Sequence, residues 1–134
     1  MELPGTRTER LLTELDFARL SKLQGRGMRS ALEGVLDAAD TLLSSEMPAD
    51  VVTMYSQVEL VDLHTGRRQS LTLCYPGDAQ PAAGFVSVLS PVGSSLLGLK
   101  VGSIARWQTP SGEQGAAEVI SVLFQPEASG NYTL

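Results

Sequence analysis

The spacing of apolar residues changes near Pro48, and this change divides the chain into two predicted parts. Before Pro48 the apolar residues recur every three or four positions, as they do on one face of a helix. After it they alternate with polar residues, as they do in strands. We therefore predict a helical segment over residues 1–47 and a sheet-containing domain over residues 48–134, which together make an α+β fold.

Two short helices joined by a turn are predicted in the N-terminal part. Thr13 is a suitable N-cap for the first helix, and Asp16 falls in its first turn. The turn contains two glycines in three positions and consists of Gln24, Gly25, Arg26 and Gly27. The second helix carries apolar residues spaced by four, three, four and three, namely Met28, Leu32, Val35, Ala39 and Leu42. This seam predicts an antiparallel helical hairpin with coiled-coil packing.

An antiparallel sheet of about five strands is predicted in the second part. Gly66 lies in a turn signal between the first two strands, and residues 77–84 are rich in Ala, Pro and Gly, as an exposed loop is. A further turn at residues 110–112 separates the last two strands. The alternating segments predict strands within residues 51–63, 71–75, 85–89, 103–109 and 115–124.

One short helix is predicted to interrupt these strands. Ser90 suits the N-cap position, and Pro91 suits the first helical position, where a missing backbone N–H costs nothing. Gly98 is placed to end the helix in a left-handed conformation. The sequence therefore predicts a helix that begins at Pro91 and stops before Gly98.

Composition excludes several classes of protein. The 134 residues, 43% of them hydrophobic, suffice for one ordinary core with a small appendage. A net charge of −5 argues against a protein that binds nucleic acid through nonspecific phosphate contacts. Cys74 has no partner for a disulfide and is expected to be a small buried hydrophobe. Neither a secretory signal nor a membrane-spanning segment is recognisable, so a cytoplasmic location is expected.

Four segments carry a resemblance to a known family. The run SSEMPADVVTMYSQVELVDLHTG resembles the junction at which the helices of the Rnk family, the regulators of nucleoside diphosphate kinase, give way to the first strand. LTLCYP is similar to that family's second strand, and VSVLSPVGSSLLGLKVG resembles a segment that the family shares with the Gre transcript-cleavage factors. The ending LFQPEASGNYTL resembles Rnk proteins specifically.

This resemblance implies a fold and a partner. The fold is a short N-terminal coiled coil joined to an FKBP-like domain, and the partner is RNA polymerase, bound at the entrance of its secondary channel in competition with Gre factors. The residues implied to contact the polymerase are Ser90, Pro91, Val92 and Gly93. The chain is expected to act as a monomer without a cofactor or metal ion, and to influence nucleoside diphosphate kinase only through gene expression.

The predicted hairpin tip departs from the cleavage factors. Their activity needs acidic residues there, because carboxylates help to hold the metal ion that activates water. This sequence has Arg26 at that place, and its nearest acids with helical spacing are Glu33 and Asp37, more than one turn away. We therefore predict a noncatalytic protein, with a cleavage factor that uses Glu33 or Asp37 as the alternative.

A second alternative is a peptide-binding or prolyl isomerase module of the FKBP type. That activity uses a pocket lined by aromatic residues, and only 5% of this chain is aromatic. Fold analogy alone does not supply the activity. A Ser-His-Asp triad finds no support either, because His64, the only histidine, falls in the turn between two predicted strands.

Overall fold

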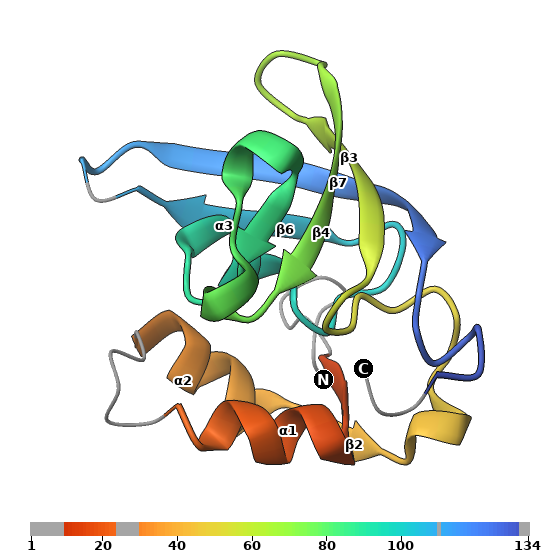
Figure 1. Cartoon of the computed structure of the whole chain (residues 1–134). Helices are drawn as coiled ribbons and strands as arrows, with labels where there is room; N and C mark the ends of the chain where they lie inside the picture. The colour runs from red at the N-terminus through yellow and green to blue at the C-terminus, as the bar shows by residue number, and fades with distance from the viewer. Residues whose placement is uncertain (1–9, 24–29, 110, 132–134) are drawn as a thin grey trace, which may run out of the picture.

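The computed structural model describes residues 10–23, 30–109 and 111–131, and it has an α+β fold built on a curled five-stranded sheet (Figure 1). The strand order is β5-β4-β3-β7-β6. The strands are β3 (Gln57–Asp62), β4 (Arg68–Cys74), β5 (Phe85–Ser87), β6 (Ile104–Gln108) and β7 (Gln114–Phe124). The predicted number of strands in this sheet, and the turn at Gly66 with its positive φ of 74°, are confirmed.

One strand pair differs from the predicted antiparallel arrangement. β5 runs parallel to β4, with Thr72 opposite Phe85, whereas the other three pairs in this sheet are antiparallel. The connection between β4 and β5 contains two single turns, η2 (Pro76–Asp78) and η3 (Pro81–Ala83). These turns bring the chain back before it pairs again, so the prediction of a wholly antiparallel sheet is wrong at this edge.

The first strand of the sheet begins later than predicted. Ser56 N donates to Thr53 O at 3.0 Å, and Tyr55 between them has a φ of 66°. A positive φ is rare for a residue with a side chain and is incompatible with an extended strand. The chain therefore makes a tight turn here instead of a continuous strand. Residues 51–56 therefore lie outside β3, and Val52 N donates instead to Leu99 O at 2.8 Å.

The N-terminal part contains β1 (Leu11–Thr13), α1 (Glu14–Ser21), α2 (Ser30–Ala38) and β2 (Asp40–Leu42), and the turn η1 (Ser44–Glu46) follows. The predicted cap of α1 is confirmed, because the Thr13 hydroxyl accepts a hydrogen bond from Asp16 N at 2.9 Å. The predicted end of the second helix is wrong. Its last seam residue, Leu42, lies in β2, because β2 pairs in parallel with β1 and draws the chain out of the helix.

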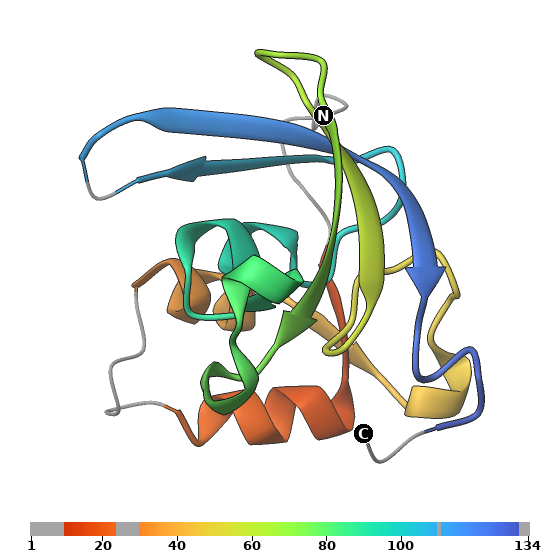
Figure 2. The ribbon, with the colours of Figure 1, turned by 45° about the horizontal axis from the view of Figure 1, so that its top comes forward.

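The coiled coil itself stays a prediction that the described residues do not confirm. Met28 and the whole predicted tip, Gln24 to Gly27, lie outside the described residues. The helices instead share a core with the sheet, since Leu20 of α1 and Leu32 of α2 belong to the hydrophobic cluster that contains Leu73 of β4. Figure 2 shows both helices beneath the curled sheet, on the side where the short helix α3 lies.

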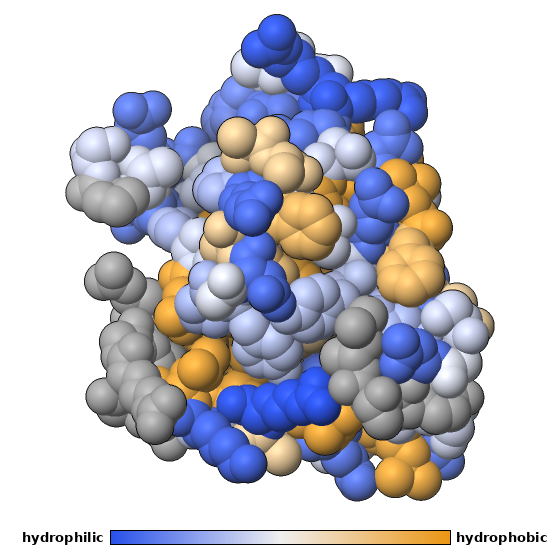
Figure 3. Space-filling view, viewed as in Figure 1, coloured by the Kyte–Doolittle hydropathy of each residue, from blue (hydrophilic) through white to orange (hydrophobic). Residues whose placement is uncertain are grey.

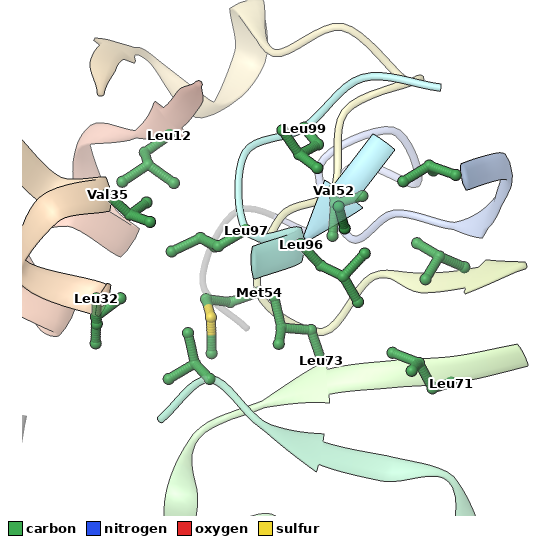
Figure 4. Packing of buried hydrophobic residues seen from close by; sticks show 14 of the residues in the cluster. Leu12, Leu32, Val35, Val52, Met54, Leu71, Leu73, Leu96, Leu97 and Leu99 are labelled. Carbon is green, nitrogen blue, oxygen red and sulfur yellow. The ribbon is translucent and has the colours of Figure 1, made fainter. Parts of the chain in front are cut away.

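The last residue of α3 (Pro91–Leu96) and the residues that follow it belong to this core. Leu96, Leu97 and Leu99 are fully buried. In Figure 4, Leu97 points towards Leu12 and Val35 of the N-terminal part, whereas Leu96 points away from them. Side chains from both predicted parts therefore meet in one cluster, and the boundary between residues 47 and 48 stays a prediction.

Candidate protein-binding surface at the start of α3

The start of α3 is held by a serine hydroxyl that accepts one hydrogen bond and donates another. The Ser90 hydroxyl accepts a hydrogen bond from Gly93 N at 3.0 Å and donates one to Ser87 O at 2.7 Å. Pro91 occupies the first helical turn, as predicted. Gly98 has a φ of 82°, which confirms the predicted left-handed residue beyond the helix. These contacts hold the turn before the helix and the helix start as one rigid unit.

The four residues predicted to contact a partner do not lie at equal depth. Ser90, Pro91 and Val92 are half-buried and reach the surface, whereas Gly93 is buried. A Cβ atom on Gly93 would lie 2.0 Å from Ser87 O, which is closer than atoms can approach. Gly93 therefore lets the helix pack against the end of β5, and the surface itself is formed by the three residues before it.

Apolar side chains lie close to this surface in the sequence. Leu89 and Val92 are half-buried and pack against the main core, and Phe85 on the edge strand β5 is 38% exposed. Figure 3 shows that polar residues cover much of this side of the molecule, with smaller apolar areas between them. A nonobligate interface is about as apolar as the rest of a protein surface, so this mixed composition is compatible with a protein partner but does not identify one.

Arg10 holds the other end of α3, and the sequence analysis missed it. Its Nη1 donates to Leu97 O at 2.9 Å, Ser95 O at 3.0 Å and Ser94 O at 3.3 Å. A cation at the carboxyl end of a helix is electrostatically favourable. Burial lowers the pKa of Arg10, which stays a cation near neutral pH. A single arginine before an apolar run gives no sequence signal of a contact more than 80 positions away.

The alternative catalytic residues lie on another helix. Glu33 and Asp37 are both exposed on α2. Among the residues that the structure describes, no group of three or more His, Cys, Asp or Glu side chains is arranged to hold a metal ion. The predicted tip, with Arg26, lies outside those residues, so its role stays a prediction.

The remaining chemical candidates have ordinary surroundings. His64 is exposed, and its backbone N–H donates to Asp62 Oδ1 at 2.8 Å. Cys74 is fully buried, as predicted, and burial raises the pKa of its thiol. One groove of about 430 Å³ lies beside His64 and includes a single aromatic residue, Trp107. This groove does not have the aromatic lining that prolyl isomerisation by an FKBP-type enzyme would need.

No helix in the described ranges is long and apolar enough to cross a membrane.

Comparison with known proteins defines the class. Residues 47–124 match the family model described as "Transcription elongation factor, GreA/GreB, C-term". A solved transcription elongation factor GreA/GreB from Nitrosomonas europaea is similar over 88% of this chain and 100% of its own, with a TM-score of 0.72 and 32% identity. GreA of Bacillus anthracis is 31% identical over 82% of this chain and 69% of its own length. The fold is thus that of the GreA/GreB factors.

A more specific relationship follows from a comparison over nearly the whole chain. The "Regulator of nucleoside diphosphate kinase" of Escherichia coli strain K12 is 38% identical over 130 residues, which cover 92% of this chain and 96% of that protein. The chain belongs to the family of regulators of nucleoside diphosphate kinase, which is related to the Gre factors. The relatives are named as a regulator and as elongation factors, which favours a transcription regulator over an FKBP-type isomerase.

Proposed function

We propose that this chain is a noncatalytic regulator that binds RNA polymerase at the entrance of its secondary channel and competes there with Gre-type factors. Its similarity to GreA supports the assignment to transcription regulators, because relatives named as GreA are transcription elongation factors. The described parts of the two helices support the noncatalytic part of the proposal, because α1 and α2 have 8 and 9 residues there. Helices of this length span roughly 13 Å each, at about 1.5 Å per residue.

The observation that carries the proposal is the rigid start of α3 within the segment that matches the GreA/GreB model. Ser90 and Arg10 fix the two ends of the helix, and Pro91 and Val92 reach the surface between them. A surface that is ordered before binding loses little conformational entropy when a partner docks. The surface that includes Ser90, Pro91 and Val92 is therefore the proposed contact with the polymerase.

A binding titration with core RNA polymerase tests the contact. Pro91→Asp places a charge in the proposed contact, while an acidic residue in the first turn of a helix is compatible with folding. We expect its dissociation constant to rise by about tenfold or more, which corresponds to a loss of about 1.4 kcal/mol. Ser45→Asp is the matched control, because Ser45 is exposed in η1 and the same charge is added there.

Two results would contradict the proposed contact. One is a wild-type chain that does not bind the polymerase at micromolar concentration. The other is an equal loss of affinity in Pro91→Asp and Ser45→Asp, which would assign the effect to net charge instead of position. Melting curves of both variants show that any loss of binding occurs in a folded chain.

The alternative of transcript cleavage has its own test. A stalled elongation complex is incubated with the chain, and shortening of the RNA is measured. We expect no stimulation above that of polymerase alone. Stimulation that is lost in Glu33→Gln or Asp37→Asn would replace the noncatalytic proposal with a cleavage factor. We also propose that the chain binds as a monomer, so the stoichiometry with polymerase should be one to one.

A further inference from the structure

Three distant segments meet in a buried polar cluster beneath α1. Asp16 comes from α1, Thr53 and Ser56 come from the turn before β3, and Glu127 comes from the segment after β7. Their exposed fractions are 2% for Asp16, 0% for Thr53 and Ser56, and 9% for Glu127. Two carboxyl groups are therefore largely removed from water in one place, which is costly unless they are bonded or neutralised.

The hydroxyl groups in this cluster have a defined order of donors and acceptors. Thr53 Oγ1 donates its one proton to Glu127 Oε1 at 2.6 Å. The 2.9 Å contact between the two hydroxyls must then be a donation from Ser56 Oγ to Thr53 Oγ1. Ser56 Oγ in turn accepts a hydrogen bond from Thr53 N at 2.8 Å. The order leaves Glu127 as an acceptor at the end of the chain of bonds.

The second carboxyl group binds the next residue of the same turn. Asp16 Oδ2 accepts a hydrogen bond from Met54 N at 3.3 Å. Thr53 and Met54 are adjacent, so α1 and the C-terminal segment attach to neighbouring groups of one tight turn. The negative charge of Glu127 acts on Asp16 at this place.

The charges around Asp16 work in opposite directions. Burial and, to a smaller extent, the charge of Glu127 raise the pKa of Asp16 to about 7, although the hydrogen bonds from Met54 and Thr13 and the charge of Arg19 on α1 act to lower it. From the end of β4, Tyr75 also faces the cluster, and burial together with the charge of Asp16 raises the pKa of its hydroxyl. Arg19 acts on Tyr75 in the opposite sense.

We infer that Asp16 and Glu127 form a proton-controlled latch between α1, the Thr53–Ser56 turn and the C-terminal segment. The latch is closed while Asp16 carries a proton, because Glu127 then supplies the only negative charge of the two. When that proton leaves, two negative charges lie in the same buried cluster, and Asp16 is driven towards water. Burial acts on Asp16 more strongly than the bond from Met54 N, which by itself favours the ionised carboxylate. The bond between Asp16 and Met54 N then opens, and the contact between α1 and the turn loosens.

A neighbouring pair of hydrogen bonds, donated by Gln125, does not depend on pH. Gln125 is buried, and its Nε2 donates to Pro48 O at 2.7 Å and Val51 O at 2.8 Å. An amide does not titrate, so this anchor keeps the start of the C-terminal segment in place at either pH. The opening is therefore local to Asp16 and Glu127 and does not unfold the sheet.

Amide hydrogen exchange of the full chain tests the latch. The protection factor of the Met54 amide is measured by NMR at about pH 6 and about pH 8, with intrinsic exchange rates corrected at each pH. We expect it to fall by about tenfold or more at the higher pH, while the Val119 amide, which donates to Ser103 O, keeps its protection.

Three variants distinguish the latch from general pH effects. Asp16→Asn keeps an acceptor for Met54 N and has no proton to lose, so its Met54 protection should stay high at both pH values. Glu127→Gln keeps an acceptor for Thr53 and removes the charge that raises the pKa of Asp16, so the fall should shrink and move to lower pH. Asp37→Asn removes an exposed carboxyl of α2 and should behave as wild type.

Three outcomes would overturn the inference. In the first, Met54 protection in the wild type does not change between the two pH values. In the second, Asp16→Asn shows the same fall as the wild type, which would assign the change to another group. Parallel loss of protection at Val119 would show global unfolding and would also contradict a local latch.

Discussion

Helices α3 and α1 are both short and both lie against the main core, but different kinds of group hold them. A serine hydroxyl caps α3 at its start and the guanidinium of Arg10 binds its end. α1 is tied to the Thr53–Ser56 turn through the carboxyl group of Asp16. The groups at α3 keep one charge state across ordinary pH, whereas Asp16 titrates near neutrality. Hydrogen bonds that do not titrate therefore hold α3 in place, whereas the attachment of α1 depends on the protonation of Asp16.

The largest effect is expected for a substitution that disturbs the close packing of α3. Gly93→Ala places a Cβ atom 2.0 Å from a backbone oxygen, Ser87 O, and the backbone must move to admit it. We expect the free energy of unfolding to fall by about 4 kcal/mol or more, since strain at a packed backbone is among the costliest substitutions. Urea unfolding measures the change.

Gly77→Ala is the control for that experiment, because nothing lies within 4 Å of a Cβ atom at Gly77. Its stability should stay within about 0.5 kcal/mol of wild type, as is usual at open surface positions. Equal stability of Gly93→Ala and Gly77→Ala would contradict the tight packing of α3 on the end of β5.

The second prediction concerns pH and α1. The pKa of Asp16 rises from 3.8 to about 7 on folding, so between these values the folded chain holds a proton that the unfolded chain has released. Stability should therefore fall as the pH rises from about 4 to about 7, by at most about 4 kcal/mol, and level off above that.

Denaturant unfolding at about pH 5 and about pH 8 measures this dependence. Asp16→Asn has no proton to lose, so it should remove much of the decline and be more stable than wild type at the higher pH. A steeper decline in Asp16→Asn, or a variant that is less stable at the higher pH, would show that the ionised carboxylate is favourable in the folded chain.

The third prediction removes the cation from the end of α3. Arg10→Met keeps much of the side chain's length but leaves the carbonyl groups of Ser94, Ser95 and Leu97 without this donor. We expect a loss of about 2 kcal/mol, because hydrogen bonds from charged groups contribute more than neutral ones. Arg106→Met, at an exposed position of β6, should change stability little.

The smallest effect is expected at the other end of the same helix. Ser90→Ala removes the acceptor for Gly93 N and the donor to Ser87 O, and it should cost about 1 kcal/mol. Ser90→Thr keeps both functions and should recover most of that loss. Thermal melts of the three chains compare them, and an unchanged midpoint in Ser90→Ala would show that the cap does not hold the helix.

Local features of this fold could be predicted from the sequence, whereas long-range ones could not. The cap at Ser90, the end near Gly98 and the final hairpin of β6 and β7 were predictable, because each depends on residues close in sequence. The parallel pairing of β5 and the short strand β2 were not, because partners far along the chain decide them.

The candidate surface was likewise predicted only in part from the sequence. Ser90, Pro91 and Val92 were named from the sequence and lie at the surface, whereas Gly93 was named with them and is buried. Arg10 and the Asp16–Glu127 pair gave no local pattern, because their partners come from segments brought together only by the tertiary fold. The residues that hold a surface in place are thus harder to predict than the residues that form it.

The most direct test of the proposed function is competition for core RNA polymerase. Labelled wild-type chain is bound to the polymerase, and unlabelled GreA is added in increasing excess. The account predicts complete displacement with the concentration dependence of a single shared site, and weaker competition by Pro91→Asp in the reverse experiment. A complex that holds this chain and GreA together, with neither displaced, would contradict docking at the secondary-channel entrance.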